Sequence, residues 1–312
     1  MKTSLVVTVF NEEKTIDRLL NSLAKQTEKA DEIILIDGGS TDRTVEKIKA
    51  FKSLKPLPQV IIAKGATIAQ GRNRGIEEAK NEIIAMTDAG CEVHPDWFEK
   101  ITKPFERKDV DIVAGFYRMT GNLVFQKCLA CYLGVLPERL DPENFMPSFR
   151  SVALKKEIWQ KVGGFNEKLE QCGEDTLFNY QAKQSGAKFL TIKEALVDWE
   201  MPKTLKEAFQ KFYHYAKGDG QINIKPHNLK ILAIYSRYLL GILLLILGLS
   251  VPIFWSVLAL LIALYYFWAI VKNFRDVKAL SAIVFLPVIQ VISDWAVMAG
   301  FLLGSLNGVN KS

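Results

Sequence analysis

Cysteine and histidine are scarce in this 312-residue chain, which contains four of the first and three of the second. Four cysteines are too few for a disulfide scaffold, and no Cys/His spacing typical of structural zinc occurs. With 11 prolines and 20 glycines, the chain is not a collagen-like repeat. The glycine-rich fingerprints of dinucleotide-binding folds and P-loops are also absent, so neither kind of phosphate site is expected.

Charged residues are missing from most of the C-terminal quarter of the chain. Arg237 is the only one in residues 231–270, and Asp294 is the only one in residues 281–310. The net charge of +6 is therefore the sum of +3 from the nearly balanced residues 1–230 and +3 from the short apolar tail. Because part of the positive excess flanks this tail and forms no basic patch, we expect no nucleic-acid partner.

Three apolar segments of the tail are long enough to cross a bilayer, which takes about 20 residues in a helix. They cover residues 231–249, 253–271 and 282–303. Buried helices of soluble proteins are usually shorter and keep a polar face, which disfavours a buried helical hairpin. We therefore predict a membrane domain of about three transmembrane helices over residues 231–304.

Lysine and arginine around these segments predict their orientation. The first segment is preceded or entered by Lys225, Lys230 and Arg237, and the second is followed by Lys272, Arg275 and Lys278. Because cytoplasmic loops are enriched in these residues, we expect a cytoplasmic N-terminal domain in a multi-pass protein of the cell membrane, with the C-terminus outside. The apolar run 5–10 is too short for a secretory signal.

Asp294 lies in the middle of the third predicted span, where an ionisable side chain is costly. Two interpretations stay open: a functional residue, or a helix–helix hydrogen bond. Arg237 is expected to extend toward the cytoplasmic interface.

Before residue 220, short β-rich runs alternate with segments of helical spacing. The expected strands are residues 5–10, 32–37, 59–63 and 82–87, and the expected helices are 15–24, 44–51 and 68–79. This alternation predicts an α/β fold with a mostly parallel, Rossmann-like sheet covered on both faces.

Polar residues follow three of these expected strands. Asn11 and Glu12 follow the first, Asp37 and a Gly-rich turn end the second, and Asp88 follows the fourth. Ligands of open α/β sheets bind beyond the carboxyl ends of the strands. One such polar residue alone would be a turn or a helix cap, but three consecutive strand ends favour a ligand site.

The same residues carry a family resemblance. Residues 7–13 (VTVFNEE), 36–44 (IDGGSTDRT), 71–75 (GRNRG) and 87–90 (TDAG) resemble the donor half of a family 2 glycosyltransferase. Residues 152–154 (VAL), 163–165 (GGF) and 173–175 (GED) resemble its acceptor half. The resemblance covers roughly residues 4–220. It implies a cytoplasmic GT-A domain over residues 1–220 and an inverting transfer from a nucleotide-activated sugar.

The resemblance also assigns residues to the donor. Asp37 would accept a hydrogen bond from the nucleotide base, and Asn11 and Glu12 would line the same nucleotide-sugar pocket. Arg72 would contact the donor at its phosphates. The alternative for Arg72 is a solvated helix face.

Asp88 matches the first acid of the family's metal-binding Asp-x-Asp motif, which implies Mg²⁺ or Mn²⁺ as cofactor. Such an ion would neutralise charge on the departing nucleoside diphosphate. The sequence departs from the motif at its third position, which is Gly90, and Glu92 is a candidate second ligand.

Glu174 and Asp175 open an expected helix over residues 175–184, where acids are common in the first turn. The resemblance implies that Asp175 is the general base for the acceptor hydroxyl and that Glu174 supports it or contacts the acceptor. If the acceptor is a polyprenyl phosphate, its nucleophile is already anionic and needs no base.

Residues 203–217 have the spacing of an amphipathic helix with several lysines, ending at a Gly-Asp-Gly stop. The pattern is typical of a helix on anionic lipid, with packing on the domain's own core as the alternative. The resemblance places the acceptor entrance near Trp199, Tyr213 and His214. Processive members carry Gln-x-x-Arg-Trp here, but Tyr213 and His214 occupy those positions, so we expect one sugar per encounter.

These patterns predict a membrane-anchored, non-processive glycosyltransferase of cell-envelope glycans that uses a lipid or lipid-linked acceptor at the cytoplasmic face. A polyprenyl-phosphate sugar synthase is the alternative within the enzyme class. From another class, the chain could be an inactive membrane scaffold that keeps a nucleotide-sugar-binding fold.

Overall fold

The computed structural model describes residues 1–169, 172–223 and 225–308. They form two compact units. The first unit combines Met1–Met119 with Pro137–Glu200, and the second combines Thr120–Leu136 with Met201–Ser312.

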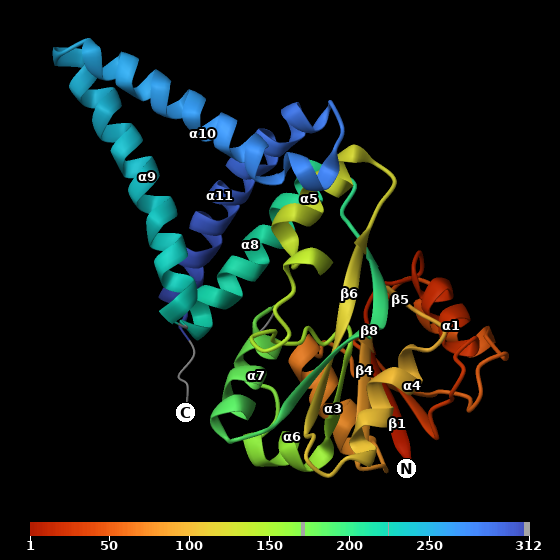
Figure 1. Cartoon of the computed structure of the whole chain (residues 1–312). Helices are drawn as coiled ribbons and strands as arrows, with labels where there is room; N and C mark the ends of the chain where they lie inside the picture. The colour runs from red at the N-terminus through yellow and green to blue at the C-terminus, as the bar shows by residue number, and fades with distance from the viewer. Residues whose placement is uncertain (170–171, 224, 309–312) are drawn as a thin grey trace. The chain divides into compact units, whose positions relative to one another are not determined.

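The first unit is built on an eight-stranded sheet with the order β3-β2-β1-β4-β7-β6-β8-β5 (Figure 1). The strands are β1 (Thr3–Val9), β2 (Glu32–Asp37), β3 (Gln59–Ile62), β4 (Ile83–Asp88), β5 (Cys91–Val93), β6 (Ile112–Thr120), β7 (Val152–Lys155) and β8 (Phe189–Glu200). β1 to β4 pair in parallel, which confirms the predicted first half. β7 pairs antiparallel with β4 and β6, so the second half departs from the expected parallel order.

Helices cover this sheet. Those of the first unit are α1 (Ile16–Ala24), α2 (Thr44–Ala50), α3 (Ile68–Glu78), α4 (Trp97–Thr102), α6 (Lys156–Val162) and α7 (Glu174–Gln184). One core joins apolar residues of α3, α6 and α7 to alternate residues of the central strands, among them Val6, Ile34 and Ile84. β1 and β4 are buried along almost their whole length, so both sheet faces are covered as predicted.

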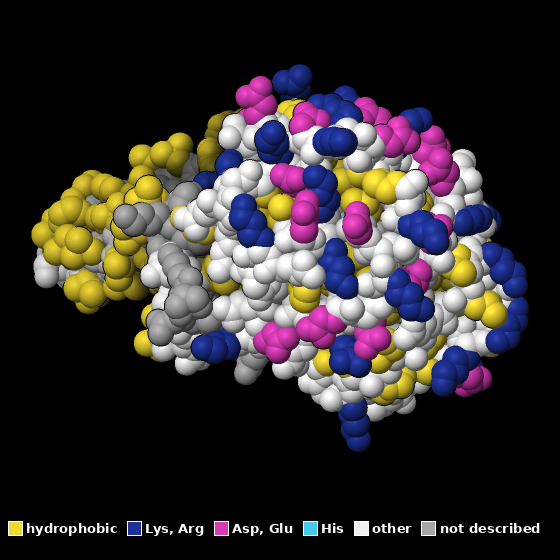
Figure 2. All heavy atoms as spheres, turned by 90° about the horizontal axis from the view of Figure 1, so that it is seen from below, with side chains coloured by type: hydrophobic (Ala, Val, Ile, Leu, Met, Phe, Trp, Pro, Cys, Tyr) yellow, Lys and Arg dark blue, Asp and Glu magenta, His cyan; other side chains and the backbone are white. Residues whose placement is uncertain are grey.

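The second unit is helical. It contains α5 (Val124–Leu133), α8 (Leu205–Ile222), α9 (Lys225–Ser250), α10 (Ile253–Val277) and α11 (Ala282–Leu306). The last three are long and apolar enough to cross a membrane. Exposed hydrophobic side chains crowd α9 and α10, whereas Lys and Arg lie among Asp and Glu elsewhere on the face in Figure 2.

The predicted Gly-Asp-Gly stop after residue 217 is wrong, because α8 continues to Ile222. Packing offsets the low helix propensity of these glycines. An added Cβ at Gly220 would lie 2.5 Å from the Phe301 carbonyl oxygen and 2.9 Å from the Ser305 nitrogen. Only a glycine therefore allows α8 to approach α11 so closely at this point.

Candidate active site

Arg72 lies in the first turns of α3, whose start and position are set by local sequence. The Thr67 hydroxyl accepts a hydrogen bond from the Gln70 N–H, and the Gln70 side chain accepts one from the Thr67 N–H. Gly75 lies against β1, where an added Cβ would collide with the Val6 side chain. The helix therefore lies close to the sheet, and only 3% of the Arg72 side chain is exposed.

The Arg72 guanidinium joins two carboxylates from distant parts of the chain. Its Nη1 lies 2.5 Å from Oε1 of Glu174, at the start of α7, and its Nη2 lies 3.1 Å from Oδ1 of Asp88, at the end of β4. The ring centres of Phe149 and Phe165 lie 5.1 and 5.7 Å from the guanidinium carbon. Three residues singled out in the sequence therefore meet in one cluster.

The Gly-Gly-Phe motif holds one of these rings in place. The Asn73 side chain accepts a hydrogen bond from the Phe165 N–H (2.8 Å) and donates one to the Phe165 carbonyl (2.9 Å). Gly164 has φ +80°, and an added Cβ there would lie 2.9 Å from Oδ1 of Asn73. Glycine at this position therefore lets Asn73 hold Phe165 against Arg72.

Glu174 is the more deeply buried of the two carboxylates, with 5% of its side chain exposed. Burial raises the pKa of Glu174 to about 7, Arg72 opposes this shift, and Asp175 adds to it. Its Oε2 is buried without a hydrogen-bond partner among the residues that the structure describes. A carboxyl group with this pKa can take up or release a proton at neutral pH.

The raised pKa of Glu174 predicts a pH dependence of stability. The folded protein holds a proton that the unfolded chain, with an ordinary pKa of 4.5, has already lost. Stability should therefore fall as the pH rises from about 4.5 through about 7. We expect the melting temperature of the wild type to fall across this range relative to that of Glu174→Gln. Parallel melting curves for the two proteins would show that the pKa of Glu174 does not change on folding.

Arg150 also reaches the cluster, and the sequence did not identify it. Its Nε lies 3.8 Å from Oδ2 of Asp88. Its guanidinium carbon lies 4.0 Å from the ring centre of Trp199, on β8, and 5.7 Å from that of Tyr117, on β6. Its only sequence signal is its place two residues before the Val-Ala-Leu motif. Asp88 therefore has a second guanidinium nearby, that of Arg150, which stacks on the ring of Trp199.

Glu12 places a second carboxylate near the end of β4. An added Cβ at Gly90 would lie 3.7 Å from Oε1 of Glu12. Glu92, the other candidate, lies on β5 with an exposed side chain. Across residues 1–169, 172–223 and 225–308, no group of three His, Cys, Asp or Glu side chains could hold a metal ion. A divalent cation at Asp88 therefore needs oxygen ligands from a substrate as well.

Asn11 shapes the turn that follows β1. Its φ of 53° lies in the left-handed region, which asparagine tolerates better than most residues. Its Oδ1 accepts a hydrogen bond from the Thr41 N–H (2.9 Å), and its own N–H donates to Oγ of Ser40 (2.8 Å). The turn after β1 is thereby tied to the turn after β2.

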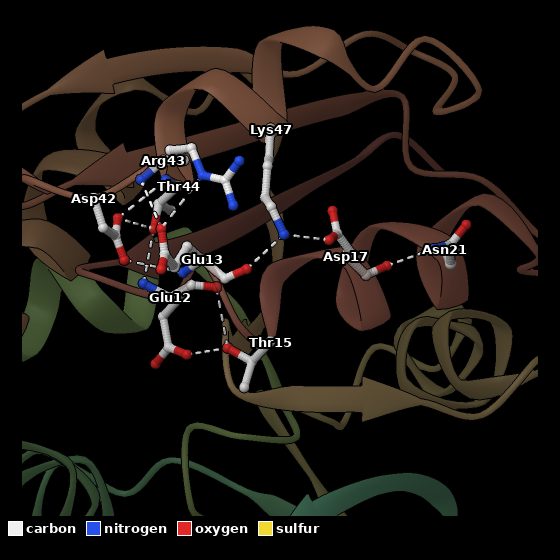
Figure 3. Close-up of polar contacts among 9 residues, drawn as sticks. All are labelled: Glu12, Glu13, Thr15, Asp17, Asn21, Asp42, Arg43, Thr44 and Lys47. Carbon is white, nitrogen blue, oxygen red and sulfur yellow. Dashed lines mark hydrogen bonds and ion pairs between the residues drawn. The ribbon is translucent and has the colours of Figure 1, made fainter.

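Further contacts connect the same two turns at the start of α2 (Figure 3). The Glu12 N–H donates to the Thr44 hydroxyl (2.8 Å), and the Glu13 N–H donates to the Asp42 carboxylate (3.1 Å). Figure 3 shows the Glu12 carboxylate turned toward Thr15 and away from Asp42. The carboxylate accepts a hydrogen bond from the Thr15 hydroxyl. The backbone of Glu12 is thus fixed by the turn, while its carboxylate faces the Gly90 side.

Asp37, at the end of β2, is 1% exposed and holds the Gly-rich turn. Its Oδ2 accepts hydrogen bonds from the N–H groups of Gly39 and Ser40, both at 2.9 Å, and its Oδ1 accepts the Ser40 hydroxyl at 2.5 Å. In this conformation the carboxylate organises its own turn.

The remaining predicted residues lie in two places. Asp175 follows Glu174 in α7, is half-buried, and accepts a hydrogen bond from the Thr176 N–H (2.7 Å). Tyr213 and His214 lie on α8 in the second unit, with their ring centres 5.4 Å apart. The structure thus brings Arg72, Asp88 and Glu174 together beside Asp175.

Two family models match this chain. Glycosyl transferase family 2 matches residues 4–127, and glycosyl transferase family 21 matches residues 69–307. The second match covers more than half of the chain and extends through the apolar helices.

Named relatives are glycosyltransferases. The chain is 24% identical to glycosyltransferase AglE of Haloferax volcanii, over 70% of this chain and 73% of AglE. It is 33% identical to the uncharacterized glycosyltransferase YibD of Escherichia coli, over 52% of this chain and 46% of YibD. A cholesterol galactosyltransferase of Borreliella burgdorferi is 28% identical over 37% of this chain and 33% of its own length. The chain therefore spans less than half of the last two relatives.

Solved structures share the fold. S. aureus TarS 1–349 in complex with UDP has a TM-score of 0.51 at 18% identity, over 73% of this chain and 68% of that one. GalNAc-T7 with UDP, GalNAc and Mn²⁺ has a TM-score of 0.52 at 19% identity, over 71% and 48%. The α/β part of the chain thus has the GT-A fold predicted from the sequence.

Proposed function

Since the chain belongs to glycosyl transferase families 2 and 21, we propose that it transfers one sugar, with inversion, from a nucleotide-sugar donor to a lipid-linked acceptor at the cytoplasmic membrane face. The observation that carries this proposal is the Arg72 cluster. A buried guanidinium between two carboxylates, at the carboxyl ends of parallel strands, suits a site for an anionic leaving group.

The donor would lie over the turns after β1 and β2. Asn11 and Glu12 would line the nucleotide pocket, and Asp37 would face the base. Two arginines flank Asp88, and their guanidinium groups provide donors for phosphate oxygens. Arg72 and Arg150 would therefore stabilise the nucleoside diphosphate as it departs.

Asp88 suits a divalent cation, because it presents a partly exposed carboxylate at a strand end with Glu12 near Gly90. Mg²⁺ and Mn²⁺ prefer such oxygen ligands and commonly share them with substrate phosphates. Asp88 would hold the ion together with the donor diphosphate. When bound, the ion would supply neutralisation of charge on the leaving group.

Asp175 would accept the proton of the acceptor hydroxyl, and Glu174 would support it from the adjacent position. The half-buried place of Asp175 beside the Arg72 cluster suits this role. Direct attack by the deprotonated hydroxyl on the sugar, opposite the diphosphate, inverts the configuration at the reacting carbon.

A lipid-linked acceptor is supported by the apolar helices of the second unit and by the similarity to a cholesterol galactosyltransferase. The lysines around the first two apolar segments support a cytoplasmic catalytic domain. Tyr213 and His214 on α8 would contribute to the acceptor region.

The test is a screen of nucleotide sugars with the full-length protein in lipid nanodiscs, with Mg²⁺ or Mn²⁺ present. We expect release of a nucleoside diphosphate from one donor class and its acceleration by a membrane lipid extract. Failure to use any donor under these conditions would favour the inactive scaffold.

Replacement of Asp175 by Asn should retain donor binding and lower transfer by about 10²–10⁴-fold, because a neutral amide cannot accept the proton. The measurement pairs nucleotide binding by calorimetry with product formation. Glu174→Gln is the matched control for a lost charge in the same turn. Near-normal transfer by Asp175→Asn would remove it from the base role and favour a polyprenyl phosphate acceptor.

A further inference from the structure

The two helices α8 and α11 approach each other almost backbone to backbone. An added Cβ at Gly300 of α11 would collide with the carbonyl oxygen of Tyr213, and one at Gly304 would collide with that of Lys217. With Gly220 on α8, these residues form an interface in which only small side chains fit. Figure 1 shows the two helices side by side.

The contacts follow the same order along both helices. Tyr213 meets Gly300, Lys217 meets Gly300 and Gly304, and Gly220 meets Gly304 and Ser305. The helices therefore run parallel. Successive turns of α8 contact successive turns of α11 along this stretch. The contacting parts of the two helices must therefore lie at the same depth in any membrane.

α8 is too polar for the hydrocarbon region. Its 18 residues include five charged ones at intervals along the helix, Lys206, Glu207, Lys211, Lys217 and Asp219. A charged side chain at the bilayer centre is costly, and α8 alone would bring several. Its lysines and exposed Leu205 and Phe209 instead suit the headgroup region.

α11 differs from the other two apolar helices in its surroundings. In the apolar part of α11, 44% of the residues are buried by the rest of the protein, against 17% in α9 and 6% in α10. At its start the Phe285 ring packs on Phe125 of α5, and the Leu286 carbonyl accepts the Tyr132 hydroxyl. α11 is thus covered by α5 at one end and by the charged helix α8 at the other.

We infer that α11 does not cross the bilayer but lies with α8 in the headgroup region, and that the α9–α10 hairpin forms the membrane-spanning part of the described helices. The exposed apolar side chains of α11, among them Trp295, Leu302 and Leu306, then dip into the acyl boundary. The end of α11 at Leu306 consequently lies on the same side as the start of α9, and not on the opposite side as three spans would place it.

The charge pattern agrees with two spans. The lysines and arginines before α9 and at the end of α10 then lie on one side, and the uncharged turn at residues 250–252 lies on the other. This inference concerns topology, and it holds or fails independently of the proposed sugar transfer.

Its test is the accessibility of an epitope tag in sealed vesicles of known orientation, using the full-length protein. The tag is placed after the last residue, or in the turn at residues 250–252, or in the link at residues 278–281. We expect the C-terminal tag to be accessible from the same side as the 278–281 tag and protected when the 250–252 tag is accessible. Accessibility of the C-terminal tag together with the 250–252 tag would overturn the inference.

A second pair of variants tests depth without any insertion. Trp295 lies near the middle of α11, and Leu260 lies on α10 more than one turn nearer to residues 250–252 than Tyr265 does; 58% and 60% of their surface is exposed. Trp295→Lys should leave the amount of membrane-inserted protein within twofold of the wild type, whereas Leu260→Lys should lower it several-fold. Equal losses for both variants would contradict an interfacial α11.

Discussion

Replacement of Arg72 by Met should lower transfer by at least about 100-fold, the usual effect of removing one group that stabilises developing charge. It should also lower the free energy of unfolding by about 3–5 kcal/mol, because removal of one partner leaves a buried charge uncompensated. Glu174, with 5% of its side chain exposed, and Asp88 would both lose a guanidinium within 3.1 Å. Product formation and thermal unfolding in nanodiscs measure the two effects.

The double variant Arg72→Met/Glu174→Gln separates these two losses. Removing the unpaired carboxylate should restore part of the melting temperature while transfer stays lost. Because Glu174 can also be neutralised by a proton, the destabilisation by Arg72→Met should grow as the pH rises toward 7 and beyond. If Arg72→Met were as stable as the wild type at both pH 5.5 and pH 8, the Arg72–Glu174 ion pair would contribute nothing to the free energy of unfolding.

Local patterns were sufficient to predict the parallel half of the sheet. Continuous apolar runs such as that of β2 indicate strands buried on both faces, and strand ends in such folds carry ligands. Arg72, Asp88 and Glu174 lie in recognisable motifs, so the sequence could single them out as candidate site residues. Their direct contact was not, since it depends on how α3 lies on β1 and where α7 begins.

Other features depend on tertiary contacts that no local pattern records. Arg150 belongs to no motif, and it lies beside Asp88 in contact with the rings of Tyr117 and Trp199, which come from distant strands. The antiparallel strands β6 and β7 follow connections that the apolar periodicity does not specify. The sequence predicts that the helix ends near Gly220. In the structure, Gly220 lies within α8 and allows its close approach to α11.

Asp294 illustrates the same limit and gives a prediction of large effect. The sequence left open whether it is functional or joins helices. In the structure it is 2% exposed, and its carboxylate accepts hydrogen bonds from Arg237 (2.5 Å) and Tyr238 (3.3 Å) of α9, from Tyr265 of α10, and from Gln290 (3.0 Å). One carboxylate therefore connects all three apolar helices.

Replacement of Asp294 by Leu should accordingly destabilise the helical unit by about 3 kcal/mol, since it removes the buried carboxylate that pairs with the partly exposed Arg237 and that accepts hydrogen bonds from the Tyr238 and Tyr265 hydroxyls. Thermal unfolding in nanodiscs, followed by the fluorescence of the tryptophans on these helices, measures the loss. The double variant Arg237→Leu/Asp294→Leu should be more stable than Asp294→Leu alone, because no charge remains unpaired. Asp294→Asn keeps hydrogen-bonding capacity and should have an intermediate effect. If Asp294→Asn instead abolished transfer and left the melting temperature unchanged, the carboxylate would act in function and not as the connection between helices.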